Sequence, residues 1–341
     1  MAELTYRSAV AAALSAEMAR DERVVLIGED VASGGVFKTT SGLRDRFGPA
    51  RVWDTPISEQ AITGAALGAA MAGLRPVAEI MFSDFYATCW DIVANEIPKI
   101  RYMTGGQVGL PLVIRGANGG GLGFGSQHSQ AVENWAMCVP GLKIVAPATP
   151  TDMLGLLTAA IRDDDPVLVF EHKALYATKE EVPDAAIAEL VVPLGTAAIK
   201  RQGQDVTLIG LASTVAVCLK AAGELADAGV SAEVIDLRTL IPLDTASILA
   251  SVRRTGHVVI VEENPSQLGW GAAIAAILAD EAFDDLAGPV VRVSGGNVPI
   301  PVALPLEAEI SVSPARVVAA VDRVLHGRRG QVNGAGGGAR T

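Results

Sequence analysis

The chain has 341 residues, of which half are apolar and 19% are charged; this length is too great for one ordinary hydrophobic core and predicts two domains. The formal net charge of −11 argues against nucleic-acid binding, which requires a clustered basic face. The longest weakly polar run, from Ala61 to Leu74, is too short and too rich in glycine to span a bilayer.

The first half alternates segments typical of strands with segments that have apolar residues at helical spacing. Ser58 is well placed to cap one of these helices and Gly73 to end it. Strands that are apolar throughout and separated by helices indicate a parallel sheet covered on both faces. The expected strands are residues 24–28, 51–53, 76–82, 110–115, 142–146 and 167–171, and the expected helices are 7–20, 59–72, 84–102 and 151–162.

Residues 173–194 interrupt this rhythm with mixed charge and two prolines, and the second half then repeats the pattern on a smaller scale. We therefore predict an α/β protein with two doubly wound parallel-sheet domains. The predicted boundaries are a domain at 1–175, a linker at 176–194, a domain at 195–326 and a disordered tail at 327–341. In the second half the expected strands are 206–211, 232–237, 258–262 and 290–293, and the expected helices are 214–228, 244–253, 271–281 and 314–325.

Three cysteines, Cys89, Cys138 and Cys218, are widely spaced, and each lies in an apolar stretch. No pair has the spacing of a metal site or a redox motif, so we expect buried structural thiols in a reducing compartment. The first residues lack the basic start and the apolar block of a signal peptide. We therefore predict a cytoplasmic protein.

A glycine-rich loop, residues 115–130, follows one of the predicted strands. Its backbone N–H groups can cradle a phosphate, but the loop has neither the lysine of a P-loop nor the spacing of a dinucleotide fingerprint. His128 is the stronger signal, because a side chain beyond the end of a parallel strand lies where open α/β sheets build their sites, and histidine transfers protons near neutral pH. A surface or packing histidine is the alternative.

Glu59 opens a predicted helix, where the helix dipole favours a carboxylate with or without a function. Gly64 and Gly68 leave one face of that helix without side chains, which permits close approach of another helix. The acidic run 163–165 either binds a cation or forms a solvated turn. The sequence shows no Ser-His-Asp or zinc-type spacing.

Several segments resemble the β subunits of the decarboxylating components of 2-oxo acid dehydrogenase complexes, a family that includes the pyruvate, branched-chain 2-oxo acid and acetoin dehydrogenases. The resemblance covers residues 4–325 in order. The matching segments are D-T-P-I-S-E (54–59), G-L-R-P-V-A-E-I-M-F-S-D-F (73–85), G-E-D-V (28–31), G-G-V-F-K-T-T-S-G-L (34–43), Q-H-S-Q (127–130), P-G-L-K-I-V-A-P-A-T-P (140–150), A-I-R-D-D-D-P-V (160–167), D-L-R-T-L-I-P-L-D (236–244) and V-P-I-P (298–301).

The resemblance implies a pyrimidine-binding domain of transketolase type followed by a transketolase C-terminal domain. It implies an α2β2 heterotetramer that uses thiamine diphosphate, with each active site at an α–β interface. The α subunit would hold magnesium and the diphosphate through a G-D-G motif, which is absent from this sequence, as expected of a β subunit. The substrate would be a 2-oxo acid (pyruvate or a branched-chain acid) or acetoin, and the product would pass to the lipoyl group of an acyltransferase.

The resemblance also implies residues for the cofactor site. Glu59 matches the glutamate that hydrogen-bonds a ring nitrogen of the aminopyrimidine. Phe85 matches the aromatic residue that packs on the pyrimidine ring, with Ile57 and Thr88 also at the cofactor. His128 matches the histidine that faces the thiazolium carbon and the substrate, where it handles protons or negative charge.

The resemblance also implies a structural cation. The backbone carbonyls of Leu112, Ala160, Asp163 and Asp165 match positions where some relatives hold potassium. A large, weakly held cation coordinated mainly by carbonyl oxygens fits such a set. Near the cofactor, Thr88 replaces a longer or cyclic residue common in the family, so the substrate stays open among acetoin, pyruvate and branched-chain 2-oxo acids.

An acidic stretch, containing Glu281, Asp284 and Asp285, precedes the last predicted strand. The family delivers its product to an acyltransferase core whose small binding module is basic. These acids are therefore a candidate docking site, and a solvated loop is the alternative.

Three other functions compete with the family resemblance. A split transketolase-like subunit acting on sugars is disfavoured by the Q-H-S-Q segment and the long C-terminal match. A catalytically silent scaffold needs none of Glu59, Phe85 and His128. A stand-alone nicotinamide dehydrogenase lacks the dinucleotide fingerprint.

Overall fold

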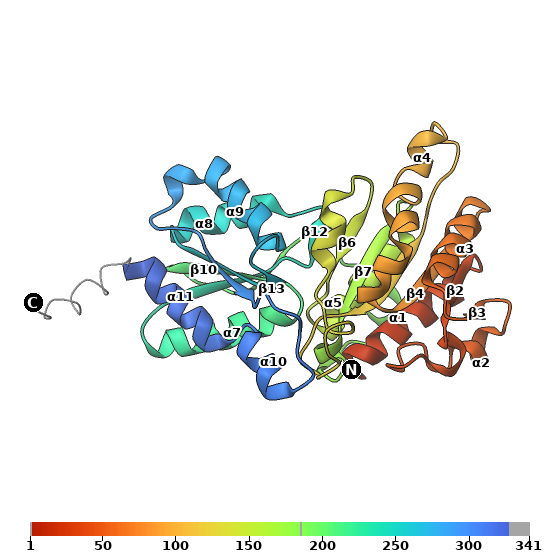
Figure 1. Cartoon of the computed structure of the whole chain (residues 1–341), viewed down its shortest axis with the longest axis horizontal. Helices are drawn as coiled ribbons and strands as arrows, with labels where there is room; N and C mark the ends of the chain where they lie inside the picture. Colours follow the sequence, from red (N-terminus) through yellow and green to blue (C-terminus); the bar gives the residue numbers. More distant parts are fainter. Residues whose placement is uncertain (1, 185, 327–341) are drawn as a thin grey trace, which may run out of the picture.

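The computed structural model describes residues 2–184 and 186–326, so the predicted tail at 327–341 lies outside the described residues. Two α/β domains lie next to each other along the long axis of the molecule (Figure 1). Most strands and helices occur within a few residues of the predicted positions, and the predicted α/β class with parallel sheets is confirmed.

The first half contains eight strands and five α-helices within the described residues. The strands are β1 (Ala2–Thr5), β2 (Val24–Glu29), β3 (Val52–Thr55), β4 (Arg75–Phe82), β5 (Val113–Asn118), β6 (Lys143–Val145), β7 (Val167–His172) and β8 (Lys179–Val182). The α-helices are α1 (Tyr6–Arg20), α2 (Leu43–Phe47), α3 (Glu59–Met71), α4 (Ile100–Met103) and α5 (Pro150–Arg162). Short 3-10 helices include η1 (Val31–Ser33), η2 (Ser83–Cys89), η4 (Glu133–Cys138) and η5 (Lys173–Leu175).

The second half, after the short helix α6 (Ala186–Glu189), is built in the same way. Its strands are β9 (Ala198–Arg201), β10 (Val206–Gly210), β11 (Ala232–Asp236), β12 (Thr239–Ile241), β13 (Val258–Pro265) and β14 (Val291–Gly295). Its helices are α7 (Ser213–Asp227), α8 (Thr245–Thr255), α9 (Trp270–Glu281), the 3-10 helix η6 (Phe283–Asp285), α10 (Leu304–Ile310) and α11 (Pro314–His326).

The larger sheet has seven strands in the order β12-β6-β7-β5-β4-β2-β3. Its strands are parallel except β12, which comes from the second half and pairs antiparallel with β6. One face is covered by α1 and α5, which bury side chains such as Leu14 and Leu157. The other face is covered by α3 and the segment after β4, which bury Ile62 and Tyr86. Helices on both faces bury both sides of each central strand, which explains their continuous apolar sequence.

The smaller sheet has the order β14-β13-β10-β11-β9, with only β9 antiparallel to its neighbour. Helices α7 and α11 cover one face. The opposite face packs under α8 and α9 and belongs to the same core as one face of the larger sheet, so that Leu168 and Ile235 lie in a single cluster. The two domains therefore share a continuous hydrophobic core.

The predicted helix at 84–102 is wrong as a single element. The chain forms the 3-10 helix η2, a π-helical turn η3 (Ile92–Glu96) and the short α4. Apolar periodicity does not distinguish these hydrogen-bonding patterns, and short 3-10 and π turns often mark functional positions.

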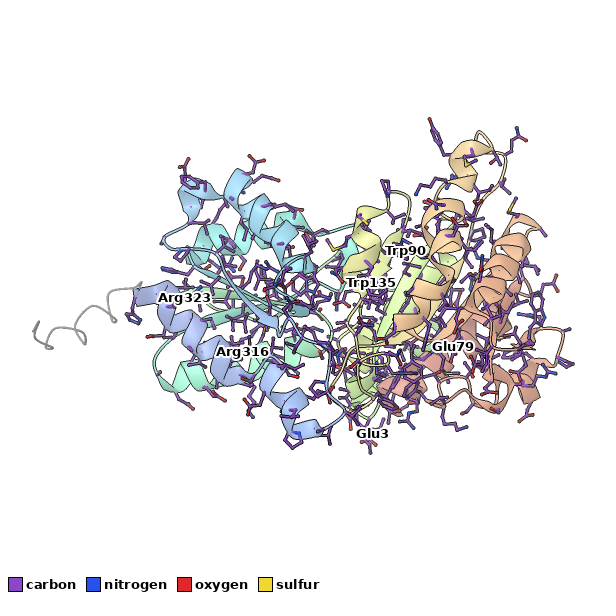
Figure 2. The ribbon with its side chains drawn as sticks, in the orientation of Figure 1. Glu3, Glu79, Trp90, Trp135, Arg316 and Arg323 are labelled. Carbon is purple, nitrogen blue, oxygen red and sulfur yellow. The ribbon has the colours of Figure 1, made fainter. Side chains whose placement is uncertain are left out.

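The predicted strand at 110–115 begins and ends later, as β5, and a charged residue is buried within it. Arg115 contacts Glu79 of β4 and bonds Glu171 of β7 at 2.8 Å. Glu79 lies within the first domain, in the sheet (Figure 2). Charged residues therefore continue the strand, because neighbouring strands supply their partners.

Two further expectations meet a different structure. Within 176–194, predicted as a linker, the chain forms α6 and β8, and β8 pairs antiparallel with β1, so that Ala2 lies opposite Val182. Cys138 is exposed, so the prediction of three buried thiols is wrong for this one, whereas Cys89 and Cys218 are buried. Cys138 ends the surface turn η4, where its apolar sequence neighbours do not cover it.

Candidate active site

Glu59 is the first residue of α3, immediately after the short strand β3 and its loop. Ser58 is in the N-cap position, but its side chain makes no capping hydrogen bond, so that part of the prediction is corrected. The free N–H groups and the dipole at a helix start favour a carboxylate there. Glu59 is half-buried, and its side chain is held by a residue distant in sequence.

Thr88 provides this contact from η2, the 3-10 helix that follows β4. Its hydroxyl lies 3.0 Å from Oε2 of Glu59 and 2.8 Å from the carbonyl oxygen of Phe85. The structure therefore brings together three residues that the sequence analysis singled out. Ala87 and Trp90, on the same stretch of chain, line a hollow together with Trp135 of η4; the two tryptophans are labelled in Figure 2.

His128 lies on the glycine-rich loop after β5. Its ring packs edge-on against two phenylalanines, at centroid distances of 4.7 Å to Phe82 and 5.1 Å to Phe85. Because β4 and β5 are adjacent and parallel, the segments that leave their carboxyl ends meet at one edge of the sheet. His128 therefore joins the group formed by Glu59 and Thr88 through Phe85.

An aromatic cluster that the sequence analysis missed supports this site. Phe82 stacks edge-on with Phe37 at 5.4 Å and lies 5.7 Å from Phe124, which comes from the same loop as His128. Edge-to-face aromatic pairs fix the relative positions of the rings. Two features of the sequence could have indicated this cluster: Phe124 lies within the glycine-rich loop, and Phe82 is the last residue of a buried strand.

Lys173 is a second residue that the sequence analysis missed. Its side chain is buried, and its Nζ lies 5.6 Å from the centroid of the Phe82 ring. Within the described residues this ammonium has no hydrogen-bond partner. Burial lowers the pKa of Lys173 to about 8, against the opposing pull of carboxylates such as Asp84 and Glu263. The amino group of Lys173 is therefore desolvated and lies near the Phe82 ring, which also contacts His128.

Ile57 has a different environment from the other predicted cofactor residues. It lies in the loop between β3 and α3, two positions before Glu59, and its side chain is 74% exposed. Phe85 is half-buried and Thr88 is exposed. This part of the site is thus an open surface with apolar groups beside a carboxylate.

The acidic residues of the predicted cation site are paired with basic side chains. Nζ of Lys143 lies 2.7 Å from both carboxylate oxygens of Asp163 and 3.4 Å from Asp165. Arg101 also contacts Asp165. Within residues 2–184 and 186–326, no cluster of three or more His, Cys, Asp and Glu side chains has the arrangement of a metal site.

Three of the four carbonyl groups of that site also have donors. Leu112 accepts the N–H of Val167 at 2.9 Å, and Ala160 accepts the N–H of Asp163 at 3.3 Å. The carbonyl of Asp163 accepts a 2.7 Å hydrogen bond from the guanidinium of Arg75. Positive charge at this turn is therefore already supplied by side chains of the chain itself.

Comparison with known proteins defines the class of the chain. Residues 2–179 match the model of the transketolase pyrimidine-binding domain, and residues 195–317 match that of the transketolase C-terminal domain. Among solved structures, a split-gene transketolase described as an inactive β4 tetramer has a TM-score of 0.77 and 26% identity, covering 95% of this chain and 99% of that one. The fold is thus of transketolase type.

Curated relatives narrow this class. The chain is 44% identical to the mitochondrial pyruvate dehydrogenase E1 component subunit beta of Dictyostelium discoideum, over 94% of this chain and 91% of the relative. In Bacillus subtilis it is 43% identical to the 2-oxoisovalerate dehydrogenase subunit beta and 41% identical to the acetoin:2,6-dichlorophenolindophenol oxidoreductase subunit beta, covering 94% of this chain and 98% and 97% of the relatives. The chain belongs to this family of E1-type β subunits.

Proposed function

We propose that this chain is the β subunit of a thiamine diphosphate-dependent dehydrogenase that acts on a 2-oxo acid or on acetoin. The observation that carries the proposal is the contact of Thr88 with the Glu59 carboxylate, beside the adjoining rings of Phe85 and His128. A carboxylate at a helix start, an apolar wall and an imidazole are three different chemical functions gathered at one sheet edge. A scaffold subunit requires none of them.

The groups at this edge suit an aminopyrimidine ring. Ile57 and Phe85 offer apolar surface for the flat ring, and Glu59 is the carboxylate that would share a proton with a ring nitrogen. Thr88 would keep that carboxylate oriented. Thiamine diphosphate, when bound, supplies a reactive carbon of its thiazolium ring; orientation and proton handling are left to the protein.

His128 would act on the substrate and on the lipoyl acceptor. An imidazole can both take and give a proton near neutral pH. Its contacts with Phe82 and Phe85 limit rotation of the ring, so that the nitrogen atoms are held in one direction. The proposed reaction is oxidative decarboxylation of the 2-oxo acid, or cleavage of acetoin, followed by transfer of the acyl group to the lipoyl group of an acyltransferase.

A second chain is part of this proposal. The sequence has no G-D-G motif, so we assign the magnesium and diphosphate site to an α subunit in an α2β2 heterotetramer. Ile57 is 74% exposed, and large apolar side chains beside a polar site gain stability when a partner covers them.

The proposal leaves three substrate classes open: pyruvate, branched-chain 2-oxo acids and acetoin. Relatives named for pyruvate, 2-oxoisovalerate and acetoin have identities of 44%, 43% and 41% to this chain, a spread too narrow to select one. The 26% identity to the split-gene transketolase is lower, which disfavours sugar transfer.

Reconstitution tests the proposal. The purified chain, checked free of any α subunit, should turn over none of the three substrates. Mixed with a cognate α subunit, magnesium and thiamine diphosphate, it should oxidise one class with an artificial acceptor and acylate a lipoyl domain. Substantial turnover by the chain alone would contradict the two-chain site, and turnover of sugar phosphates would favour the split transketolase.

Potassium at Leu112, Ala160, Asp163 and Asp165 stays a prediction, which the surrounding charges do not favour. The guanidinium of Arg75 already donates to the Asp163 carbonyl at 2.7 Å, so a cation would have to share that oxygen. A bound potassium ion should raise the melting temperature more than sodium does at equal ionic strength. Identical melting curves in the two salts would remove the ion from the proposal.

The location of the protein is likewise proposed. Over the part of the chain that the structure describes, no helix combines the length and the apolar character needed to cross a bilayer. We propose a cytoplasmic location, although several relatives carry mitochondrial names. Fractionation of cells followed by immunodetection of the chain tests it.

A further inference from the structure

The loop that carries His128 is closed at its base within the first domain. The N–H of Gly119 donates to the carbonyl of Gln130 at 2.9 Å, and the N–H of Gln130 donates to Asp84 at 3.0 Å. These bonds fix where the loop leaves and rejoins the domain. They leave the middle of the loop, where the histidine is positioned, to be held by other contacts.

Those contacts come from the C-terminal domain. The carboxylate of Glu307, in α10, accepts the N–H of Gly121 at 2.7 Å on one oxygen and the N–H of Gly123 at 3.0 Å on the other. Glu263, at the end of β13, accepts the N–H of Gly120 at 2.6 Å. Glu307 is only 3% exposed, so its charge is compensated by these amides rather than by water.

Glycine is required for this arrangement. Gly121 and Gly123 have φ values of +91° and +71°, a left-handed conformation that other residues rarely adopt. Backbone N–H groups in such turns converge on a single anion. A Cβ atom on Gly123 would also lie 3.0 Å from the carbonyl oxygen of Val302, just before α10. The two glycines thus allow the loop to pack closely against the start of α10.

One more bond ties the loop close to the histidine. The hydroxyl of Ser126 donates to the carbonyl of Ile300 at 2.9 Å. The N–H of His128 then donates to the carbonyl of Gly125 at 3.3 Å. The segment from Gly123, which Glu307 binds, to His128 is therefore short and is bonded at both ends.

We propose that Glu307 is a positioning residue for His128: from the C-terminal domain, its carboxylate clamps the glycine-rich loop and so sets the place of the imidazole in the active site. This rests on the proposed function, because it assigns His128 a role at the substrate. The clamp gives the C-terminal domain a part in catalysis, although the imidazole is carried by the first domain. A displacement of about 1 Å at a reacting group costs up to about 10²-fold in rate.

The test compares Glu307→Gln with Glu309→Gln, an exposed glutamate on the same helix. An amide keeps the shape of the side chain, but its NH2 group cannot accept a backbone N–H. The first readout is amide hydrogen exchange of residues 119–128 in the isolated chain, which requires no activity. We expect faster exchange in Glu307→Gln and wild-type exchange in Glu309→Gln.

The second readout uses the reconstituted tetramer. Glu307→Gln should lower kcat about 10- to 100-fold while leaving the exchange rate of the thiazolium proton, which depends on Glu59, unchanged. In a His128→Gln background the same substitution should add less than about a twofold change, because the two residues act through one group. If Glu307 only stabilised the fold, Glu307→Gln would lower the melting temperature. It would then change both kcat and the exchange rate of the thiazolium proton, or neither of them.

Either of two results would overturn the proposal: unchanged amide exchange in the loop, or an additive effect of Glu307→Gln on the His128→Gln variant. If Glu307→Gln does not fold, Glu307→Asp replaces it, because it keeps the buried carboxylate but withdraws it from the N–H groups of Gly121 and Gly123; the same outcomes apply. A wild-type tetramer without turnover would count against the proposed function alone, since amide exchange still tests the clamp.

Discussion

The hydroxyl of Thr88 is hydrogen-bonded to the carboxylate of Glu59, a residue 29 positions earlier in the chain, at 3.0 Å. The same hydroxyl lies 2.8 Å from the carbonyl oxygen of Phe85. A hydroxyl has one proton and two lone pairs. It can donate to an ionised Glu59, and it can accept from a protonated Glu59 while it donates to Phe85. Thr88 therefore suits a carboxyl group that gains and loses a proton.

Removing this hydroxyl should slow activation of the cofactor. Thr88→Val keeps the side-chain shape but leaves Glu59 without this partner, and loss of a hydrogen bond to a charged group costs about 1.5 to 3 kcal/mol. We expect exchange of the thiazolium proton to slow by about 10-fold or more in the tetramer. Thr88→Ser, which restores a hydroxyl, should recover most of the rate; a wild-type rate in Thr88→Val would contradict the role.

Substitution of Glu59 and of His128 should affect different steps. Glu59→Gln can form a hydrogen bond but cannot share a proton with a ring nitrogen, so exchange of the thiazolium proton should slow by about 10² to 10⁴-fold whatever the substrate. His128→Gln should spare that exchange and slow substrate addition or acyl transfer. The measurements are hydrogen–deuterium exchange at the thiazolium carbon and single-turnover kinetics with a lipoyl domain.

Two results would contradict these assignments. If the thiazolium proton exchanges at the wild-type rate in Glu59→Gln, the Glu59 carboxylate only stabilises the start of α3. Full overall activity in His128→Gln would make the histidine a packing residue of the loop.

Buried Lys173 should make stability depend on pH in the alkaline range. Burial lowers its pKa in the folded chain from 10.5 to about 8. Between these values the unfolded chain binds more protons, so stability rises with pH. Since one pKa unit corresponds to about 1.4 kcal/mol, the effect is on the order of 3 kcal/mol.

Urea denaturation between pH values of about 8 and 10.5 compares the wild type with Lys173→Met. The variant should lose this rise and be the more stable chain at the lower pH, where the buried ammonium costs most. Lys220→Met, at an exposed position of α7, should behave like the wild type. A rise of equal size in Lys173→Met would mean that another group titrates.

The acidic turn at the end of α9 is the candidate docking surface for an acyltransferase. Phe283 is 71% exposed beside Asp284, whereas Asp285 bonds Arg253 at 3.2 Å. Asp284→Lys should therefore weaken capture of the acyltransferase core, more at low salt than at high salt, without disturbing the fold. Assembly with the α subunit should not change.

A matched control for this surface is Asp227→Lys, an exposed acid at the end of α7. It changes the net charge by the same amount at a different place. Equal binding of the core by both variants would mean that Asp284 is a solvated surface residue.

Local patterns in the sequence were sufficient for most of the framework. Apolar runs separated by amphipathic segments located the strands that form the two parallel sheets, because such strands bury both faces. The position of Glu59 at a helix start and of His128 on a loop beyond a strand also followed from residue order. The break of 84–102 into three short turns did not, since apolar spacing is nearly the same for 3-10, α and π hydrogen bonding.

Contacts between distant segments were decided only by the tertiary structure. The pairing of β12 with β6 joins the second half of the chain to the first sheet, and no local property of a three-residue strand selects that partner. No local feature of the sequence distinguishes Lys173 from an exposed lysine. In the structure its side chain is buried, and its ammonium lies near the Phe82 ring.

The sequence by itself determined the α/β class, the family resemblance and the residues that we propose for the chemistry, because each depends on residue type and order along the chain. The tertiary structure decided which of these residues meet. Thr88 reaches Glu59, and Glu307 reaches the loop of His128 across the two domains. Hydrogen bonds of this kind depend on distances between segments that only the packing of the sheets and helices fixes.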